Sequence, residues 1–138
     1  MTISPEARNV IGWIIITIPT IEFGGAFLLT LLRRWQNAPV SAVQTAYYRA
    51  GHAHAGVLVI LSILAQLLID VPALDNPLPG LLRAGFFAAP VLVSAGFFAG
   101  APGKDSPTPR PGIALIYLGA LVLAVSAIVL GLALVFGS

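Results

Sequence analysis

The chain has no cysteine among its 138 residues. This absence excludes disulfide bonds, thiol catalysis, iron–sulfur clusters and zinc sites with cysteine ligands. Histidine is nearly absent too, with only His52 and His54 present. Two histidines at i and i+2 of a helix point apart and cannot hold one ion, so we expect no metal site. The P-loop and the hydrolase motifs Gly-x-Ser-x-Gly and His-Glu-x-x-His are missing as well, so no catalytic residues are predicted.

Charge is also scarce, because Asp, Glu, Lys and Arg make up 9% of the chain, against roughly 25% in ordinary soluble domains. Apolar residues make up 58%, and the mean hydropathy is +0.97. This composition excludes a soluble globular enzyme, a disordered tail and a nucleic-acid-binding module. The seven Lys and Arg form no dense basic face, so no nucleic acid is expected as a partner.

Long apolar runs are abundant in the chain. A run of about 20 residues is long enough to cross a bilayer as a helix. Four such runs occur, at about residues 10–32, 48–69, 81–101 and 113–136. The sequence therefore predicts an all-α integral membrane protein: a single membrane domain over residues 1–138, with four transmembrane helices packed as a bundle in the lipid bilayer.

The basic residues between the runs predict an orientation. The first connection with its junctions and the third connection hold five of them: Arg33, Arg34, Arg49, Lys104 and Arg110. The other side holds two, Arg8 and Arg83. Cytoplasmic loops carry the excess of Lys and Arg, so we expect a multi-pass protein with both termini on the non-cytoplasmic side. The high Ala, Gly and Pro content is typical of a bacterial inner membrane protein.

Small residues recur in the last two runs, where close helix contacts depend on them. The segment 84–88 is repeated as 95–99, both reading Ala-Gly-Phe-Phe-Ala. The fourth run has a ridge of small residues spaced by three or four: Ala120, Ala124, Ala127 and Gly131. These ridges predict packing within the bundle or self-association, as a homo-oligomer or in a larger membrane complex. Pro19 and Pro90 are expected to bend their helices.

Ionisable groups inside apolar runs are costly, and each is by default a functional-site hypothesis. Glu22 lies about 15 Å from the cytoplasmic end of the first run at 1.5 Å per residue. His52 and His54 lie roughly 6–9 Å into the second run from the same side. The two runs are antiparallel neighbours, so a contact between Glu22 and a histidine is geometrically plausible.

The second run has one polar stripe. At about 100° per residue, five polar side chains fall within a sector of roughly 80°: Tyr48, His52, Ser62, Gln66 and Asp70. His54 falls at about 200° from His52, nearly opposite. Such a stripe should face the bundle interior or a wet crevice. It predicts a hydrogen-bonded seam between helices, a proton or solute path, or a cofactor site.

The segment Tyr47-Tyr48-Arg49-Ala50-Gly51-His52-Ala53-His54 resembles a helix of haem–copper oxidase subunit I. In that helix, histidines at i and i+2 face opposite ways and bind two haems. The resemblance implies haem as a cofactor, with His52 and His54 as candidate axial ligands. Oxygen reduction is set aside, because its copper site needs three further histidines. The chain also resembles small uncharacterised four-span bacterial membrane proteins with a His-x-His motif.

Three functions follow from these patterns. The favoured one is a non-catalytic subunit or accessory factor in a membrane complex, whose polar residues serve packing and assembly. The second is a haem-binding, cytochrome-like membrane protein that uses His52 and His54. The third is a proton or small-solute conductor that uses Glu22 and the polar stripe.

Overall fold

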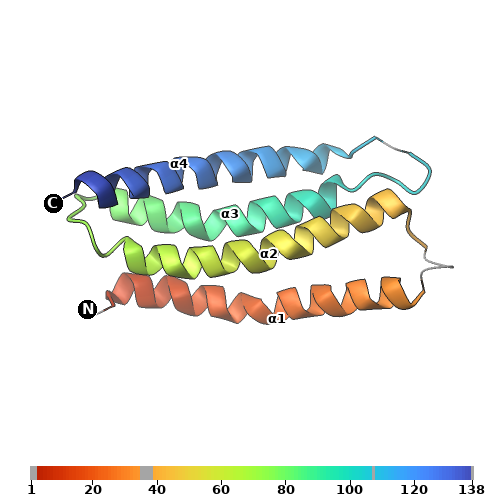
Figure 1. Ribbon diagram of the computed structural model, residues 1–138, viewed down its shortest axis with the longest axis horizontal. Coiled ribbons are helices and arrows are strands. Elements are labelled where there is room, and N and C mark those ends of the chain that lie inside the picture. The colour runs from red at the N-terminus through yellow and green to blue at the C-terminus, as the bar shows by residue number, and fades with distance from the viewer. Residues whose placement is uncertain (1–2, 35–38, 107, 138) are drawn as a thin grey trace.

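The computed structural model describes residues 3–34, 39–106 and 108–137. Its described residues form four long helices: α1 (Pro5–Arg33), α2 (Ala42–Leu68), α3 (Leu78–Gly100) and α4 (Ala114–Phe136). A short 3-10 helix, η2 (Pro111–Ile113), precedes α4. Consecutive helices run in opposite directions, and both termini lie at one end of the molecule, called here the termini end (Figure 1). All four helices are long and apolar enough to cross a membrane.

Local capping explains why the first two helices begin earlier than the apolar runs. Ser4 caps α1, its hydroxyl accepting a hydrogen bond from the amide of Ala7, and Pro5 starts the helix. Ser41 and Gln44 form a capping box at the start of α2. As a result α2 begins at Ala42, six residues before the apolar run expected from Tyr48.

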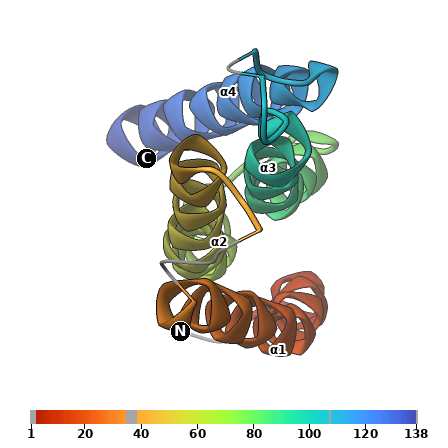
Figure 2. The same cartoon turned by 90° about the vertical axis from the view of Figure 1, so that its right-hand side faces the viewer.

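The four helices do not pack equally on one another. α3 packs extensively on both α2 and α4, whereas α1 packs mainly on α2 and hardly touches α3. Viewed along the helices, α1 and α4 lie on opposite sides of the α2–α3 pair (Figure 2). The buried apolar core lies near the termini end. It contains Ala65, Ile69, Leu82, Phe86 and Leu130. α1 is therefore the peripheral helix of the bundle.

Glycines set the distance between α3 and α4. A Cβ on Gly96 would lie 2.6 Å from the backbone nitrogen of Ile116, and one on Gly119 would lie 2.8 Å from Val93. The glycines of the repeated Ala-Gly-Phe-Phe-Ala segment do pack between helices, since Gly85 faces Ser126. The expected ridge on α4 does not, because Ala120, Ala124 and Ala127 are exposed and nothing lies within 4 Å of a Cβ on Gly131. α4 packs on α3 with a different face.

Pro90 lies inside α3 and has no amide hydrogen to give to the carbonyl of Phe86. The hydroxyl of Ser62, on α2, donates a hydrogen bond to that carbonyl. Ser62 is 1% exposed. Ser62, a member of the predicted polar stripe, thus donates a hydrogen bond to a backbone carbonyl that the proline leaves unpaired.

Candidate functional site

The polar stripe of α2 divides into two groups in the structure. Ser62, Gln66 and Asp70 lie at the termini end and contact α3. Tyr48 and His52 lie towards the other end and contact α1. Along α2 the ten residues from His52 to Ser62 span about 15 Å, and the stripe positions between them hold Ala55 and Val59. The stripe is therefore interrupted by apolar side chains.

The termini-end group is organised around Arg83, a buried residue of α3. Its guanidinium forms an ion pair with Asp70. It also donates hydrogen bonds to the backbone carbonyl of Gln66 (3.1 Å), to the Gln66 side-chain oxygen (3.3 Å) and to the hydroxyl of Ser4 (3.2 Å). Asp70 in turn accepts from the backbone amide of Ser4 at 3.2 Å. We call Ser4, Gln66, Asp70 and Arg83 the polar knot.

The polar knot joins three helix ends. Ser4 caps the start of α1, and Gln66 lies in the last turn of α2. The positive guanidinium beside this last turn also interacts favourably with the negative end of the α2 dipole. Every one of these contacts ties one helix to another, so the polar knot is a structural device. It gives Gln66 and Asp70 a packing role.

Asp70 lies just beyond the end of α2, and its pKa reflects opposing influences. Burial raises the pKa, but hydrogen bonds from the Ser4 hydroxyl and backbone amide, together with the hydrogen bond and positive charge of Arg83, outweigh it. The net effect holds the pKa of Asp70 below its ordinary value of 3.8. The carboxylate of the polar knot is therefore stabilised in its charged form.

Asp70 was predicted as a member of the polar stripe, whereas Arg83 was counted only as a basic residue that bears on the orientation, and Ser4 was not predicted as a site residue. The sequence did indicate that Arg83 is paired, because it lies in an apolar run, where an arginine needs a partner. Asp70, just beyond the end of the preceding helix, and Asp75 were the acidic residues nearest to it in the sequence. The contact between Arg83 and Ser4 was harder to predict, since the two residues are 79 positions apart in the sequence.

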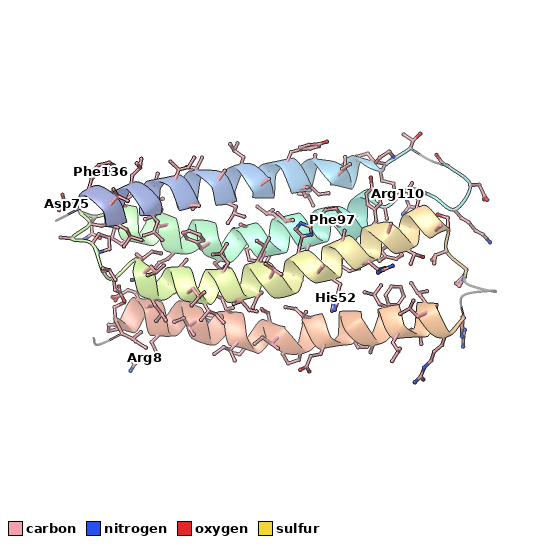
Figure 3. The ribbon with its side chains drawn as sticks, in the orientation of Figure 1. Arg8, His52, Asp75, Phe97, Arg110 and Phe136 are labelled. Atoms are coloured by element: carbon pink, nitrogen blue, oxygen red, sulfur yellow. The ribbon has the colours of Figure 1, made fainter. Side chains whose placement is uncertain are left out.

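His52 packs against the glycine pair of α1. A Cβ on Gly24 or Gly25 would lie 3.3–3.4 Å from the His52 ring. Figure 3 shows His52 on the side of α2 that faces α1. One turn earlier, Tyr48 lies between Phe27 of α1 (ring centroids 5.7 Å apart) and Phe98 of α3 (5.6 Å, stacked). The imidazole therefore lies close beside residues 24 and 25, and a side chain at either position would be in tight contact with it.

His54 lies on another side of α2, against α3. Its ring is 4.8 Å from that of Phe97, and its Nδ1 donates to the carbonyl of Ala50 at 2.7 Å. A carbonyl only accepts, so this contact assigns the proton to Nδ1 and leaves Nε2 as the acceptor nitrogen. His54 is exposed, and the hydrogen bonds described for the chain include none at Nε2.

Glu22 is exposed on α1, and the described residues provide no hydrogen-bond or ion-pair partner for its carboxylate. The plausible contact with a histidine is therefore absent within one protomer. Because His52 packs on Gly24 and Gly25 and the helices are antiparallel, Glu22 lies at the level of His54. This level is about 8 Å along α2 from Arg49 and about 24 Å from Asp70.

The space beside the histidines bears on the haem hypothesis. A groove with a volume of about 590 Å³ lies between the first turns of α1 and α3. Pro5, Trp13, Arg83 and Phe87 are among its lining residues, and neither histidine is. His52 is held against α1, and His54 faces the other way. One protomer therefore offers one outward imidazole nitrogen, and no group of three metal-binding side chains occurs among the described residues.

Comparison with known proteins adds no relative to this picture: no family model, curated protein or solved structure matches the chain.

Proposed function

We propose that this chain is a non-catalytic, multi-pass membrane protein that acts as a subunit or accessory factor in a membrane complex. Four helices of sufficient length and hydropathy support the membrane part of the proposal. The geometry of the polar groups supports the assembly part, since the termini-end group is used entirely in joining helices.

The proposed orientation has the termini end outside the cytoplasm of a bacterial cell, in the inner membrane. The opposite end of the bundle carries five basic residues: Arg33, Arg34, Arg49, Lys104 and Arg110. At the termini end Arg8 is exposed, whereas the charge of Arg83 is paired with Asp70. This asymmetry supports a cytoplasmic location for the opposite end.

Glu22 is the single observation that carries the assembly proposal. Its carboxyl group lies on an exposed, apolar part of the peripheral helix, between Pro19 and Ala26. A carboxyl group facing hydrocarbon costs several kcal/mol unless it is paired or protonated. A partner chain that supplies a polar group at this level removes that cost. The outward face of the bundle at Glu22 is thus proposed as an assembly surface.

The size of the protein in native membranes tests this function. We expect wild-type protein, cross-linked in the membrane and then solubilised in mild detergent, to migrate as an assembly larger than one chain. Glu22→Leu should release the monomer, because it removes the polar group that a partner satisfies. Glu6→Gln is the matched control, since Glu6 is also exposed on α1 but lies in its first turn. Identical monomeric migration of wild type and Glu22→Leu would contradict the proposal.

His54 supports haem binding as a second candidate function. Its anchored Nδ1 and outward Nε2 are the arrangement in which a histidine binds a metal, and bis-histidine ligation would take His54 from each of two protomers. The bound haem would supply electron transfer. A Soret band in the purified protein that is lost in His54→Ala and retained in His52→Ala is the expected result for this candidate. A colourless folded protein would contradict it.

Proton or solute conduction has less geometric support, because the polar stripe is interrupted at Ala55 and Val59. Proton flux into liposomes tests it directly. Flux that is present in the wild type and abolished in Glu22→Gln would favour conduction over a purely assembling role.

A further inference from the structure

Glu22 and His54 border the same outward face of the molecule. Gly25 of α1 packs on α2. Viewed along the axis of α1, Glu22 lies about 60° to one side of Gly25 and Val10 lies about 60° to the other side. Val10 lines the groove towards α3, so Glu22 lies on the flank away from α3. On α2, the outward residues Val57, Ile60 and Leu64 are 66%, 62% and 52% exposed. We call the surface made by Glu22, His54, Val57, Ile60 and Leu64 the α2 face.

The α2 face has one carboxylate at its α1 edge and one imidazole at its α3 edge. His54 marks the α3 edge because its ring contacts Phe97. Between the two polar groups the face is apolar. Neither polar group has a hydrogen-bond partner for its outward atoms among the described residues, and their chemistry is complementary: a carboxyl group donates to or pairs with an imidazole nitrogen.

Glu22 and His54 lie at the same depth along the bundle, and this restricts which partner can cover the α2 face. All copies of a chain with one orientation in a membrane keep the same depth, so a pair between two copies must join groups at equal depth. Glu22 and His54 meet this condition, since both lie about 8 Å from the level of Arg49. A twofold axis parallel to the helices keeps depth and exchanges the two edges of the face.

We propose that the α2 face binds a second copy of this chain, with Glu22 of each protomer pairing with His54 of the other. The interface is isologous and contains two such pairs, one on each side of an apolar centre formed by Val57, Ile60 and Leu64. This inference rests on the proposed function and names its partner. It also explains why the two polar groups lie on different helices of one protomer without touching.

The absence of cysteine makes a direct test simple. Val57→Cys places one thiol near the twofold axis, and mild oxidation in membranes is expected to give a disulfide-linked dimer. Val91→Cys is the matched control, because Val91 is 56% exposed on α3, beside the interface with α1. It should give no dimer. Failure of Val57→Cys to cross-link, with the same helical content as the wild type, would overturn the proposal.

Exchange of the paired residues tests the contact itself. In the Val57→Cys background, Glu22→Ala or His54→Ala should weaken dimerisation about a hundredfold, because either substitution removes both symmetry-related pairs and each charge-assisted hydrogen bond contributes about tenfold. The double exchange Glu22→His with His54→Glu should restore it, because each protomer again presents both groups at one level. Full dimerisation in both alanine variants, or no recovery in the exchange, would overturn the assignment of the pair.

The outcomes separate this inference from the proposed function. If Val57→Cys does not cross-link but the wild type migrates as a large assembly that Glu22→Leu disrupts, the partner is a different chain and only the self-pairing fails. If the wild type is monomeric in both measurements, the subunit function and the self-pairing fail together. A Soret band that depends on His54 would also overturn the pairing, since the same nitrogen cannot serve both roles.

Discussion

At the residue scale, buried polar side chains of α2 and α3 pair with backbone groups that the helices leave without a partner. Ser62 donates a hydrogen bond to the Phe86 carbonyl, which Pro90 leaves without its helical partner. Arg83 donates one to the carbonyl of Gln66 in the last turn of α2. Buried carbonyl groups without a partner are expensive, and more so in an apolar environment. The sequence places a proline in a helix and a serine on its neighbour, and the fold brings the two together.

Ser62 and Pro90 should therefore be coupled energetically. We expect Ser62→Ala to lower the free energy of unfolding by about 1–2 kcal/mol, because the Phe86 carbonyl loses its donor. In a Pro90→Ala background the new amide at residue 90 can donate to that carbonyl, so the same serine substitution should cost less than half as much. Reversible unfolding in mixed micelles measures both values in a double-mutant cycle. Strictly additive effects would count against the coupling.

Asp70 should make stability sensitive to acid. Its folded pKa lies below the ordinary value of 3.8, so its contribution is fully present above about pH 4 and is lost as the pH falls through the lowered folded value. We expect Asp70→Asn to lower the melting temperature at pH 6 and to remove most of the further loss that the wild type shows below pH 4. Melting curves of both proteins at pH 3 and pH 6 measure this.

Asp75→Asn provides the control for the acid effect. Asp75 is exposed in the connection between α2 and α3. This variant should retain the acid sensitivity of the wild type. An equal acid loss in Asp70→Asn and the wild type would show that another group is responsible.

At the scale of the helices, glycine determines which faces meet. α3 and α4 approach closely through Gly96 and Gly119, whereas the alanine ridge of α4 points outward. The glycines of α3, Gly85 and Gly96, and the alanine ridge of α4 look alike in the sequence, since each set is spaced for one helix face. The difference arises because α4 is rotated so that Ser126 and Leu130 face the core.

Two glycine substitutions distinguish these faces. Gly96→Ala should destabilise the protein by about 1–3 kcal/mol, because its Cβ would lie 2.6 Å from the backbone nitrogen of Ile116. Gly131→Ala should be neutral or stabilising by about 0.5–1 kcal/mol, since nothing lies within 4 Å and alanine favours the helix. Unfolding in detergent measures both. A loss at Gly131 as large as that at Gly96 would show that the outward ridge is also in contact.

At the scale of the whole molecule, the charges are distributed unequally between the two ends of the bundle. Figure 3 shows Arg8 at the termini end and Arg110 at the opposite end. Because Arg83 is paired with Asp70 within the fold, exposed basic residues are concentrated at the opposite end. This is the distribution from which the proposed orientation follows.

Labelling of single cysteines tests the orientation. We expect Ile3→Cys to react with a membrane-impermeant maleimide added to cells whose outer membrane is permeabilised, because the termini end faces outward. Ser106→Cys, which lies in the connection between α3 and α4, should react only after the inner membrane is disrupted. The reverse pattern would place the termini in the cytoplasm and would leave the fold unchanged.

The sequence alone determined the number of long helices and their approximate extent, because an apolar run of given length rises a fixed distance per residue. It also determined that His52 and His54 point to different sides, since their angular separation is a property of a single helix. The fold decided what depends on contacts between helices. Arg83 meets Ser4 across 79 residues, and α4 presents Gly119 rather than Ala120 to α3. The level of Glu22 relative to His54 was likewise set by the packing of His52 on the glycine pair of α1, a choice of helix register that no local pattern specifies.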